Sequence, residues 1–410
     1  MERPITAIVV DSTPSGQTHG HFVSTLRYLT HALASVSTDV RLLITRDTAK
    51  AIELDRVGSE VDWPLTTEQI AEYDGGFSSA MQQARDFFHI RSEGKNGTVV
   101  VFPWMDFINF EELRDWDDWL ASWNIPWLTI GKASASIRMP DSRLAQGERE
   151  SLNRLFGLKS AGAVFYWDFR EATSLEHLRQ YNLVNLTEFN EGLYDTDPAA
   201  CLEMPGWDRG DFRLGFFGRI SGKRGFATFL RLSLLNPRVT FVIRGAGYPH
   251  RECLWPEAEI ERFPRIGRSL AFGISRLYWS LVRRIPNLDY EEAVYDSQYR
   301  LNQELSDVHA VYVDGSRSPY SSGIALQALA CGTPVLWTLG RSSISDYLQK
   351  YVPGGRIKRW MTWTPGGLAR PRESSNEIQR TGRTYTLASM TETVRVTVSD
   401  LLSSDNSQDR

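Results

Sequence analysis

Short apolar runs alternate along the chain with longer stretches whose apolar residues have helical spacing. Residues 5–11, 40–44 and 98–102 have the composition of buried strands, and residues 21–35 predict a helix with Leu26 and Leu33 on one face. Further strands are expected at residues 127–130, 163–166 and 183–186. Because strands and helices alternate, the pattern predicts parallel sheets covered by helices on both faces.

A second alternation follows a segment rich in proline and glycine, residues 196–211, which we interpret as a linker. Strands are expected at residues 212–217, 239–244 and 308–313, with a helix at residues 225–235. The predicted organisation is an N-terminal Rossmann-like domain over residues 1–195, the linker, a C-terminal Rossmann-like domain over 212–388, a terminal helix over 389–403 and a frayed tail over 404–410.

Composition narrows the class of protein. The chain has 410 residues, 41% of them hydrophobic and 23% charged, which indicates a globular protein of two domains. Its net charge of −4 gives no reason to expect a nucleic-acid partner. The three cysteines, Cys201, Cys253 and Cys331, are sparse and odd in number, as is typical of a reducing compartment.

The predicted location is the cytoplasm. An apolar strand is expected from residue 5, which leaves no room for a signal peptide, and no apolar run is long enough to cross a bilayer. We therefore expect a cytoplasmic protein, either soluble throughout or in contact with the inner face of a membrane.

The loop after the strand at residues 212–217 is basic and glycine-rich. It places the cations Arg219, Lys223 and Arg224 where an open parallel sheet binds its ligand. One arginine guanidinium can bind two phosphate oxygens at once. The spacing does not fit a Walker A loop, and Gly245 and Gly247 at the next strand end lack the third glycine of a dinucleotide fingerprint. The alternative is a solvated basic turn.

A helix start near residue 323 supplies a second feature for an anion. Ser321 and Ser322 are good helix-capping residues, and Gly332 with Pro334 ends the predicted helix before a buried strand at residues 335–337. The amide of Gly323 and the positive end of the helix dipole suit a diphosphate.

Together these segments resemble the retaining GT-B glycosyltransferases of the large group 1, or family 4-like, type. The resemblance rests on a strand ending in Gly218-Arg219, a strand ending in a glycine pair, and the run Gln-Ala-Leu-Ala-Cys-Gly-Thr-Pro-Val that begins at Gln327. It covers residues 214–336, whereas the N-terminal half is similar only in its pattern, with residues 16–20 in the place of the family's glycine loop.

The resemblance implies an α/β fold of two Rossmann-like, doubly wound domains that face a cleft. It also implies a hexosyltransferase-like enzyme that moves a sugar from a nucleotide-diphosphate sugar to a hydroxyl of a glycan or a lipid-linked acceptor, as in polysaccharide biosynthesis. The anomeric configuration would be retained, and neither a metal nor a cofactor would be needed, because cations and a helix N-terminus neutralise the leaving diphosphate.

The family's motif also implies roles for individual residues. Arg219 and Arg224 would hold the diphosphate with Lys223 assisting, and Gln327 would bind the ribose. The remaining donor-side residues implied by the motif are Gly245, Ser321, Ser322 and Gly323. The family's two glutamates fall on Pro319 and Gln327, so this chain departs from the family at both positions.

The N-terminal loop carries candidates for the sugar side. Gly16 and Gly20 would shape the sugar pocket, and His19 or His21 would contact the transferred sugar, where an imidazole can move a proton. Surface or helix-capping histidines are the alternative. Arg138, which follows the strand at residues 127–130, would meet an anionic acceptor or be a surface arginine.

No metal site is expected. The remaining histidines are scattered without ligand spacing. Asp115 and Asp117 form the Asp-x-Asp that metal-dependent glycosyltransferases of the other major fold use, but they fall in a predicted helix with Trp116 and Leu120 at core spacing. We interpret these carboxylates as a solvated helix face.

Residues 264–286 form a basic and aromatic insertion. They contain five arginines and no acidic residue, with leucine, isoleucine, phenylalanine, tyrosine and tryptophan between them. Such a helix is typical of an anionic membrane interface. The alternative is a helix that packs on the domain with its arginines outward.

Two rival functions stay open. A non-catalytic GT-B-like protein that binds a glycan or nucleotide as a partner subunit is favoured by the missing glutamates. A sugar-nucleotide epimerase shares this two-domain build but needs acid–base carboxylates, and no convincing pair is evident in the sequence.

Overall fold

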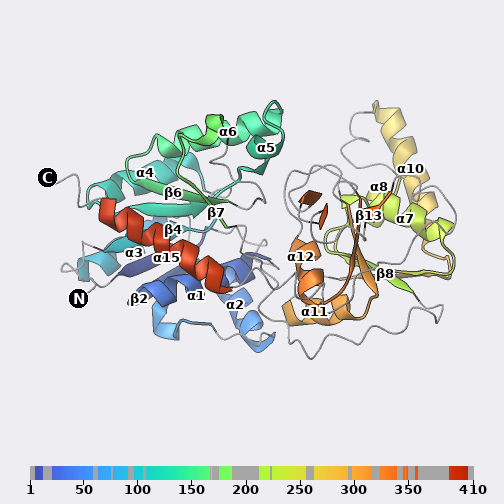
Figure 1. Ribbon diagram of the computed structural model, residues 1–410, viewed down its shortest axis with the longest axis horizontal. Coiled ribbons are helices and arrows are strands. Elements are labelled where there is room, and N and C mark those ends of the chain that lie inside the picture. Colours follow the sequence, from blue (N-terminus) through green and yellow to red (C-terminus); the bar gives the residue numbers. More distant parts are fainter. Residues whose placement is uncertain are drawn as a thin grey trace. The chain divides into compact units, whose positions relative to one another are not determined.

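The chain forms two compact units in the computed structural model. The first comprises Met1–Tyr194, Asp296–Gln298 and Tyr385–Arg410, and the second Asp195–Tyr295 and Tyr299–Thr384 (Figure 1). The structure describes residues 5–12, 21–58, 63–74, 77–90, 97–104, 108–166, 168, 175–186, 212–221, 224–254, 263–293, 298–314, 323–338, 345–346, 348–349, 356–358 and 387–404. The linker expected at residues 196–211 lies outside these ranges.

The first unit is built on a parallel sheet of seven strands in the order β3-β2-β1-β4-β5-β6-β7. In register, Val9 of the central strand pairs with Leu42 on one side and Val101 on the other. The strands are β1 (Thr6–Val10), β2 (Asp39–Thr45), β3 (Ile70–Tyr73), β4 (Thr98–Phe102), β5 (Trp127–Ile130), β6 (Ala161–Tyr166) and β7 (Leu183–Asn185).

Helices cover both faces of this sheet. Successive strand residues point to opposite faces, so Val9 enters one core with α1 and α15, while Val10 enters another with α3 and α4. The helix α15, at the end of the chain, packs against α1. The helices of this unit are α1 (His21–Val36), α2 (Arg46–Gly58), α3 (Phe77–Ile90), α4 (Phe110–Ala121), α5 (Ser134–Arg138), α6 (Arg143–Phe156) and α15 (Leu387–Ser404), with 3-10 turns η1 (Thr67–Gln69) and η4 (Glu176–Leu178).

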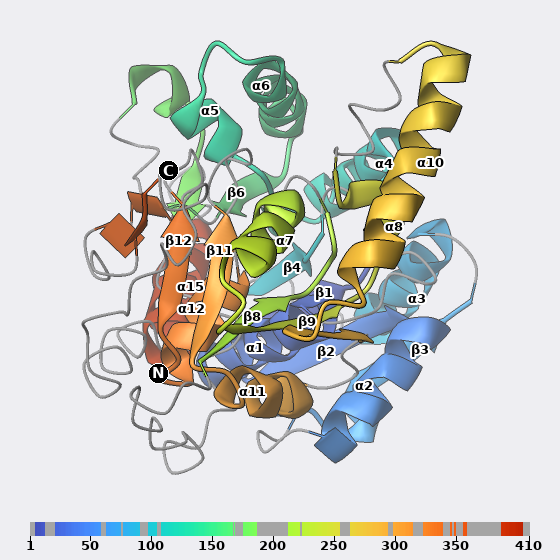
Figure 2. The ribbon, with the colours of Figure 1, turned by 90° about the vertical axis from the view of Figure 1, so that its right-hand side faces the viewer.

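The second unit contains a parallel sheet of six strands in the order β10-β9-β8-β11-β12-β13. Figure 2 labels four of them, β9, β8, β11 and β12. The strands are β8 (Arg213–Phe217), β9 (Thr240–Gly245), β10 (Leu288–Glu292), β11 (Ala310–Asp314), β12 (Val335–Thr338) and β13 (Arg356–Ile357). The helices are α7 (Phe226–Leu235), α8 (Pro249–Glu252), α10 (Arg265–Val282), α11 (Gln298–Ser306) and α12 (Gly323–Ala330).

In both sheets the order of strands reverses beside the first strand, at β1 and β4 and at β8 and β11. This arrangement is the doubly wound order of Rossmann-like domains. The predicted fold class, two such α/β domains, is therefore confirmed.

One part of the sequence interpretation is wrong. Asp115 and Asp118 of α4 are exposed as expected, but Asp117 is 1% exposed and does not belong to a solvated face. Its carboxylate accepts hydrogen bonds from the indole nitrogen of Trp127 at 2.9 Å and from the backbone amides of Lys159 and Ser160 at 2.7 and 2.8 Å. Asp117 therefore fixes the turn before β6 and the first residue of β5 to α4.

Replacing Asp117 with alanine should destabilise the first unit by about 2–4 kcal/mol, because the change leaves the buried indole of Trp127 and two partly buried backbone amides without their acceptor. Chemical denaturation followed by circular dichroism measures this loss. The matched control is Asp118→Ala, which removes a neighbouring carboxylate whose bond to Lys159 lies at the surface and should leave the denaturation midpoint in place. Equal midpoints for the two variants would contradict the structural role of Asp117.

Candidate functional site

The second sheet has its strand reversal between β8 and β11 (Figure 2). Open parallel sheets bind ligands outside the carboxyl ends of the strands at such a point. Gly218 and Arg219 follow β8 directly, and α12 begins nine residues after β11 ends at Asp314. The basic turn and the helix start that the sequence singled out therefore follow neighbouring strands.

The turn after β8 is held against the end of β9. The Gly218 amide donates to the Arg244 carbonyl at 3.0 Å, and the Ile220 amide donates to the Ala246 carbonyl at 2.8 Å. A Cβ atom on Gly245 would overlap the Gly218 carbonyl oxygen, so only glycine permits this approach of two backbones. Gly218 itself has φ +91°, a left-handed conformation that favours glycine.

Two further groups border Gly218. The Arg224 guanidinium nitrogen Nη1 and the Cγ1 atom of Ile324 lie 3.2 and 3.7 Å from the position that a Cβ atom on Gly218 would take. Ile324 belongs to the first turn of α12. The structure therefore brings Gly218, Arg224 and the start of α12 together at one edge of the sheet.

The start of α7 adds a second helix N-terminus to this edge. Gly225 caps α7 in a left-handed conformation, and no side chain accepts from the first helical amides as a cap. Gly225 also touches the end of β11, because a Cβ atom there would overlap the Asp314 carboxylate. Uncapped helix N-termini carry partial positive charge and favour anions.

The electrostatics of the turn also favour an anion. Both Arg219 and Arg224 reach solvent at this turn, although the surrounding protein partly desolvates the Arg224 guanidinium. This desolvation, followed by the positive charge of Arg219, lowers the pKa of Arg224. Within the described ranges, neither guanidinium forms an ion pair with a carboxylate. A bound dianion would relieve the repulsion between these two cations.

Arg244 of β9 is an arginine whose counter-charges come from the protein itself. Its guanidinium meets Asp289 at 2.8 Å, Glu291 at 3.6 Å and Glu304 at 3.8 Å. Arg244 is therefore held by carboxylates of its own unit, whereas the turn arginines have no such partner among the residues that the structure describes.

Gln327 occupies a different environment from the turn. It is 5% exposed, and its amide nitrogen donates to the Oδ1 atom of Asn302 in α11, whereas Gly323 at the start of α12 is exposed. The side-chain amide of Gln327 thus has a partner inside the unit, and its contact with ribose stays a prediction.

Arg138 has a partner as well, which the sequence did not indicate. Its side chain is 3% exposed and forms an ion pair with Asp168, which is fully buried. The Nε and Nη2 atoms donate to the Asp168 carboxylate at 2.8 and 2.6 Å. The structure makes Arg138 an internal cation of the first unit rather than a surface arginine, and its contact with an acceptor stays a prediction.

Several predicted residues cannot be placed. His21 is the first residue of α1, and its side chain is not described. The predicted residues that lie outside the described ranges are Gly16, His19, Gly20, Lys223, Ser321 and Ser322. Their roles stay predictions.

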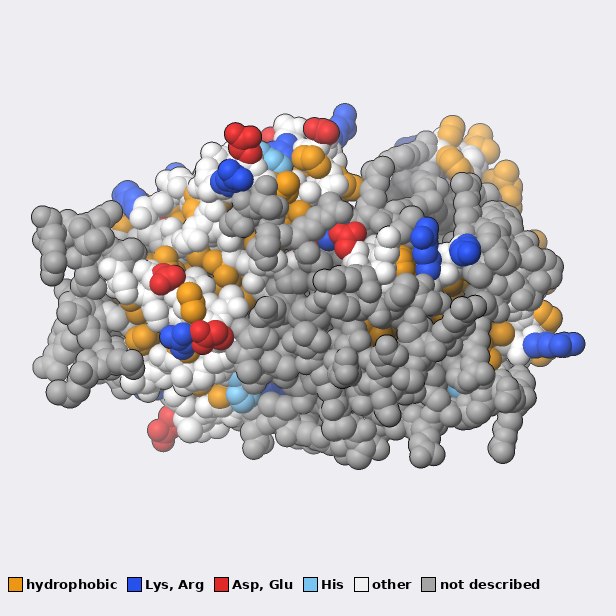
Figure 3. All heavy atoms as spheres, viewed as in Figure 1, with side chains coloured by type: hydrophobic (Ala, Val, Ile, Leu, Met, Phe, Trp, Pro, Cys, Tyr) orange, Lys and Arg blue, Asp and Glu red, His pale blue; other side chains and the backbone are white. Residues whose placement is uncertain are grey.

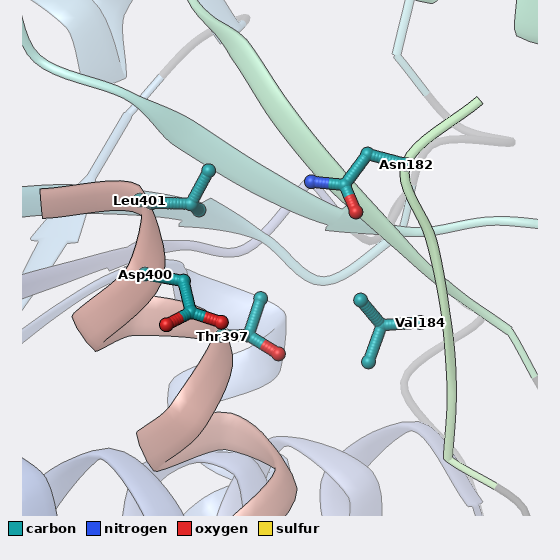
Figure 4. A pocket seen from close by; sticks show the side chains of 5 residues that line it. All are labelled: Asn182, Val184, Thr397, Asp400 and Leu401. Atoms are coloured by element: carbon teal, nitrogen blue, oxygen red, sulfur yellow. The ribbon is translucent and has the colours of Figure 1, made fainter. Parts of the chain in front are cut away.

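Neither a metal-ligand cluster nor a pocket marks the candidate site within the described ranges. In the described part of the chain, no three histidine, cysteine or acidic side chains gather as a metal site would require. A pocket of about 250 Å³ lies in the first unit between β7 and α15 (Figure 4). Its lining residues are Asn182, Val184, Thr397, Asp400 and Leu401, none of which the sequence analysis selected.

The sequence analysis missed Asp314 and Thr338, the last residues of β11 and β12. The Thr338 hydroxyl donates to the Asp314 carboxylate, next to Gly225. Each is the first polar residue after a buried apolar strand, a position that faces the ligand edge in a parallel sheet. This positional signal is present in the sequence and would have identified both.

No protein-family model matches the chain, and no curated protein matches it by sequence. Solved structures do match along almost its whole length. The Anabaena protein Alr3699/HepE, solved with UDP and glucose, is 14% identical over 98% of this chain and 98% of its own, with a TM-score of 0.51.

Two other solved structures match to a similar extent. The pneumococcal O-GlcNAc transferase GtfA, solved with UDP and GlcNAc, is 9% identical over 98% of this chain and all of its own, with a TM-score of 0.55. The N-terminal domain of the Candida albicans trehalose-6-phosphate phosphatase is 12% identical over 97% of this chain and 96% of its own, with a TM-score of 0.52. At these identities the likeness shows the fold, which is the two-domain α/β fold of the GT-B class.

Proposed function

We propose that this protein is a glycosyltransferase that uses a nucleotide-diphosphate sugar as its donor and a hydroxyl of a glycan or lipid-linked molecule as its acceptor. The observation that carries the proposal is the pair of arginines Arg219 and Arg224, which have no carboxylate partners in the described ranges and follow β8 at the strand reversal of the second sheet. The structures of HepE and GtfA were solved with UDP, which favours uridine as the base.

The proposed catalysis depends on where negative charge accumulates during the reaction. When the bond between sugar and diphosphate breaks, the leaving oxygen gains charge, and cations already fixed beside it lower the barrier. Arg219 and Arg224 supply these cations without a metal ion, and the N-terminal amides of α12 at Gly323 supply hydrogen bonds. Lys223, Ser321 and Ser322 would complete the phosphate contacts.

The acceptor side of the proposal rests on the sequence. His19 or His21 would contact the transferred sugar, and Gly16 and Gly20 would shape its pocket. Retention of the anomeric configuration follows from the resemblance to group 1 enzymes.

A second candidate function is a non-catalytic GT-B-like binding protein. It is favoured by the environment of Gln327, whose amide is hydrogen-bonded to Asn302 where the family has a glutamate. Pro319, at the other glutamate position, has no carboxylate to offer. A protein of this kind would bind the nucleotide sugar and leave it intact.

Turnover distinguishes the two functions. The full chain is incubated with UDP-, GDP- and ADP-sugars, with and without glycan acceptors, and release of free nucleotide is followed. We expect free UDP to be released from a UDP-sugar, and we expect the rate of this release to rise when an acceptor is added. Tight binding without release would support the binding protein, and a changed sugar in the absence of acceptor would indicate an epimerase.

Arg219→Ala and Arg224→Ala should each weaken the binding of UDP by about 1.5–3 kcal/mol, or roughly 10- to 150-fold in Kd, the range for a charged hydrogen bond. Isothermal titration calorimetry measures the change. Arg238→Ala is the matched control, because Arg238 is an exposed arginine before the amino end of β9, at the opposite edge of the same sheet. Unchanged affinity in both turn variants would exclude this site.

Gly245→Ala should abolish measurable UDP binding while the first unit stays folded, because a Cβ atom there displaces the Gly218 carbonyl and with it the turn. Nucleotide-dependent thermal stabilisation reads out the loss. Gly147→Ala serves as the control for the substitution itself. Gly147 lies in α6 with open space around it, so the added methyl should stabilise the protein by about 0.5–1 kcal/mol without affecting the nucleotide.

A further inference from the structure

The helix α10 exposes a continuous apolar stripe. Five large aliphatic residues repeat at helical spacing, and at about 100° per residue they fall within roughly 80° of the helix circumference. Their exposed fractions are 87% for Ile266, 63% for Leu270, 43% for Ile274, 63% for Leu277 and 59% for Leu281. Figure 3 shows orange side chains gathered at the upper right, where α10 lies in Figure 1.

Packing against the domain does not account for this stripe. The buried residues of α10 are Ala271, Ser275, Trp279 and Val282, which lie on the other side of the helix. Trp279 packs edge-on against Tyr290 of β10, so the second half of the helix is well attached to its unit. The fold therefore buries one face of α10 and leaves the apolar stripe opposite it in solvent.

The charges on α10 have one sign. Arg265, Arg268 and Arg276 lie on the helix, Arg283 and Arg284 follow its last turn, and no carboxylate occurs between Phe263 and Asn287. All but the half-buried Arg268 are exposed. By the helical repeat, Arg265 and Arg276 lie on one side of the stripe, about 120–140° from its centre. An apolar stripe together with cations of long reach matches the interface of an anionic bilayer, where aliphatic side chains enter the acyl boundary and guanidiniums extend to lipid phosphates.

We propose that α10 lies in the plane of an anionic membrane surface and attaches this protein to it through Ile266, Leu270, Ile274, Leu277 and Leu281. Attachment of this kind needs no spanning segment, and none of the described helices is long and apolar enough to cross a bilayer. The helix is about 27 Å long at 1.5 Å per residue, which accommodates all five side chains on one lipid surface. The inference does not depend on glycosyl transfer.

Flotation of the full chain with lipid vesicles tests the proposal. Vesicles of phosphatidylcholine with about one-quarter phosphatidylglycerol should carry the protein upward in a sucrose gradient at low salt, and pure phosphatidylcholine should carry much less. The combined variant Ile266→Ser, Leu270→Ser and Leu277→Ser should bind the anionic vesicles about 10- to 100-fold more weakly. The variant lacks three of the aliphatic side chains whose transfer from water into the bilayer drives binding.

A second variant tests the charges separately. Arg276→Gln with Arg283→Gln should weaken binding to anionic vesicles by about 25-fold, near fivefold per charge, and should not change the residual binding to phosphatidylcholine. Both variants alter exposed side chains only, and unchanged thermal melts would show that the fold is intact.

The matched control substitutes exposed aliphatic residues on other helices, Leu144→Ser, Leu234→Ser and Val396→Ser, and should float as the parent protein does. Failure of the parent protein to float with anionic vesicles would overturn the proposal. So would a concentration-dependent dimer that the stripe variant abolishes, since a second copy would then be the partner of α10. Equal flotation of the stripe variant and the control would overturn it as well.

Discussion

The candidate site depends on how closely two backbone segments approach at the end of the second sheet. The Gly218 carbonyl occupies the space that a Cβ atom on Gly245 would need, and amide bonds from Gly218 and Ile220 hold the turn to the end of β9. This contact determines where Arg219 leaves the backbone and brings Gly218 beside the first turn of α12. A site for a phosphate group requires this precision, since backbone amides and guanidiniums act only within hydrogen-bond distance.

The arginines of this protein differ mainly in where their counter-charges come from. Arg138 is buried with Asp168, and Arg244 is surrounded by three carboxylates, so both are neutralised within the folded chain. Desolvation by the surrounding protein, followed by the nearby positive charge of Arg219, lowers the pKa of Arg224. Two cations placed close together repel each other, and such an arrangement is typical of positions where an anionic ligand supplies the counter-charge.

Most of the strands that the sequence predicts are buried strands inside the sheets, and the edge strand β7 is the exception. β4 and β5 coincide with the predicted ranges, because continuous apolar runs such as that of β4 mark strands covered on both faces. The sequence analysis did not include β3, β10 or β13, all of which are edge strands. An edge strand such as β10, with the sequence Leu-Asp-Tyr-Glu-Glu, is half exposed and lacks the apolar run that identifies its neighbours.

Side-chain partners were harder to predict than strands. The local pattern around Asp117 is that of a solvated helix face, and only the distant residues Trp127, Lys159 and Ser160 make it a buried acceptor. The burial of Arg138 likewise depends on Asp168, thirty residues away. Arg219 and Arg224 were selected because their loop follows a predicted strand of a parallel sheet, which the sequence pattern can reveal, and their contact with a diphosphate stays a prediction.

The position of α15 has a consequence for how the protein is made. This helix closes one face of the first sheet through Val394 and Val398, which join the core that contains Val9 and Leu29. Its residues are synthesised after the whole of the second unit, so the first sheet emerges from the ribosome long before that face can be covered. The nascent first unit must keep an apolar surface out of contact with other chains until α15 has been synthesised, and a stop codon before residue 387 would leave that surface permanently open.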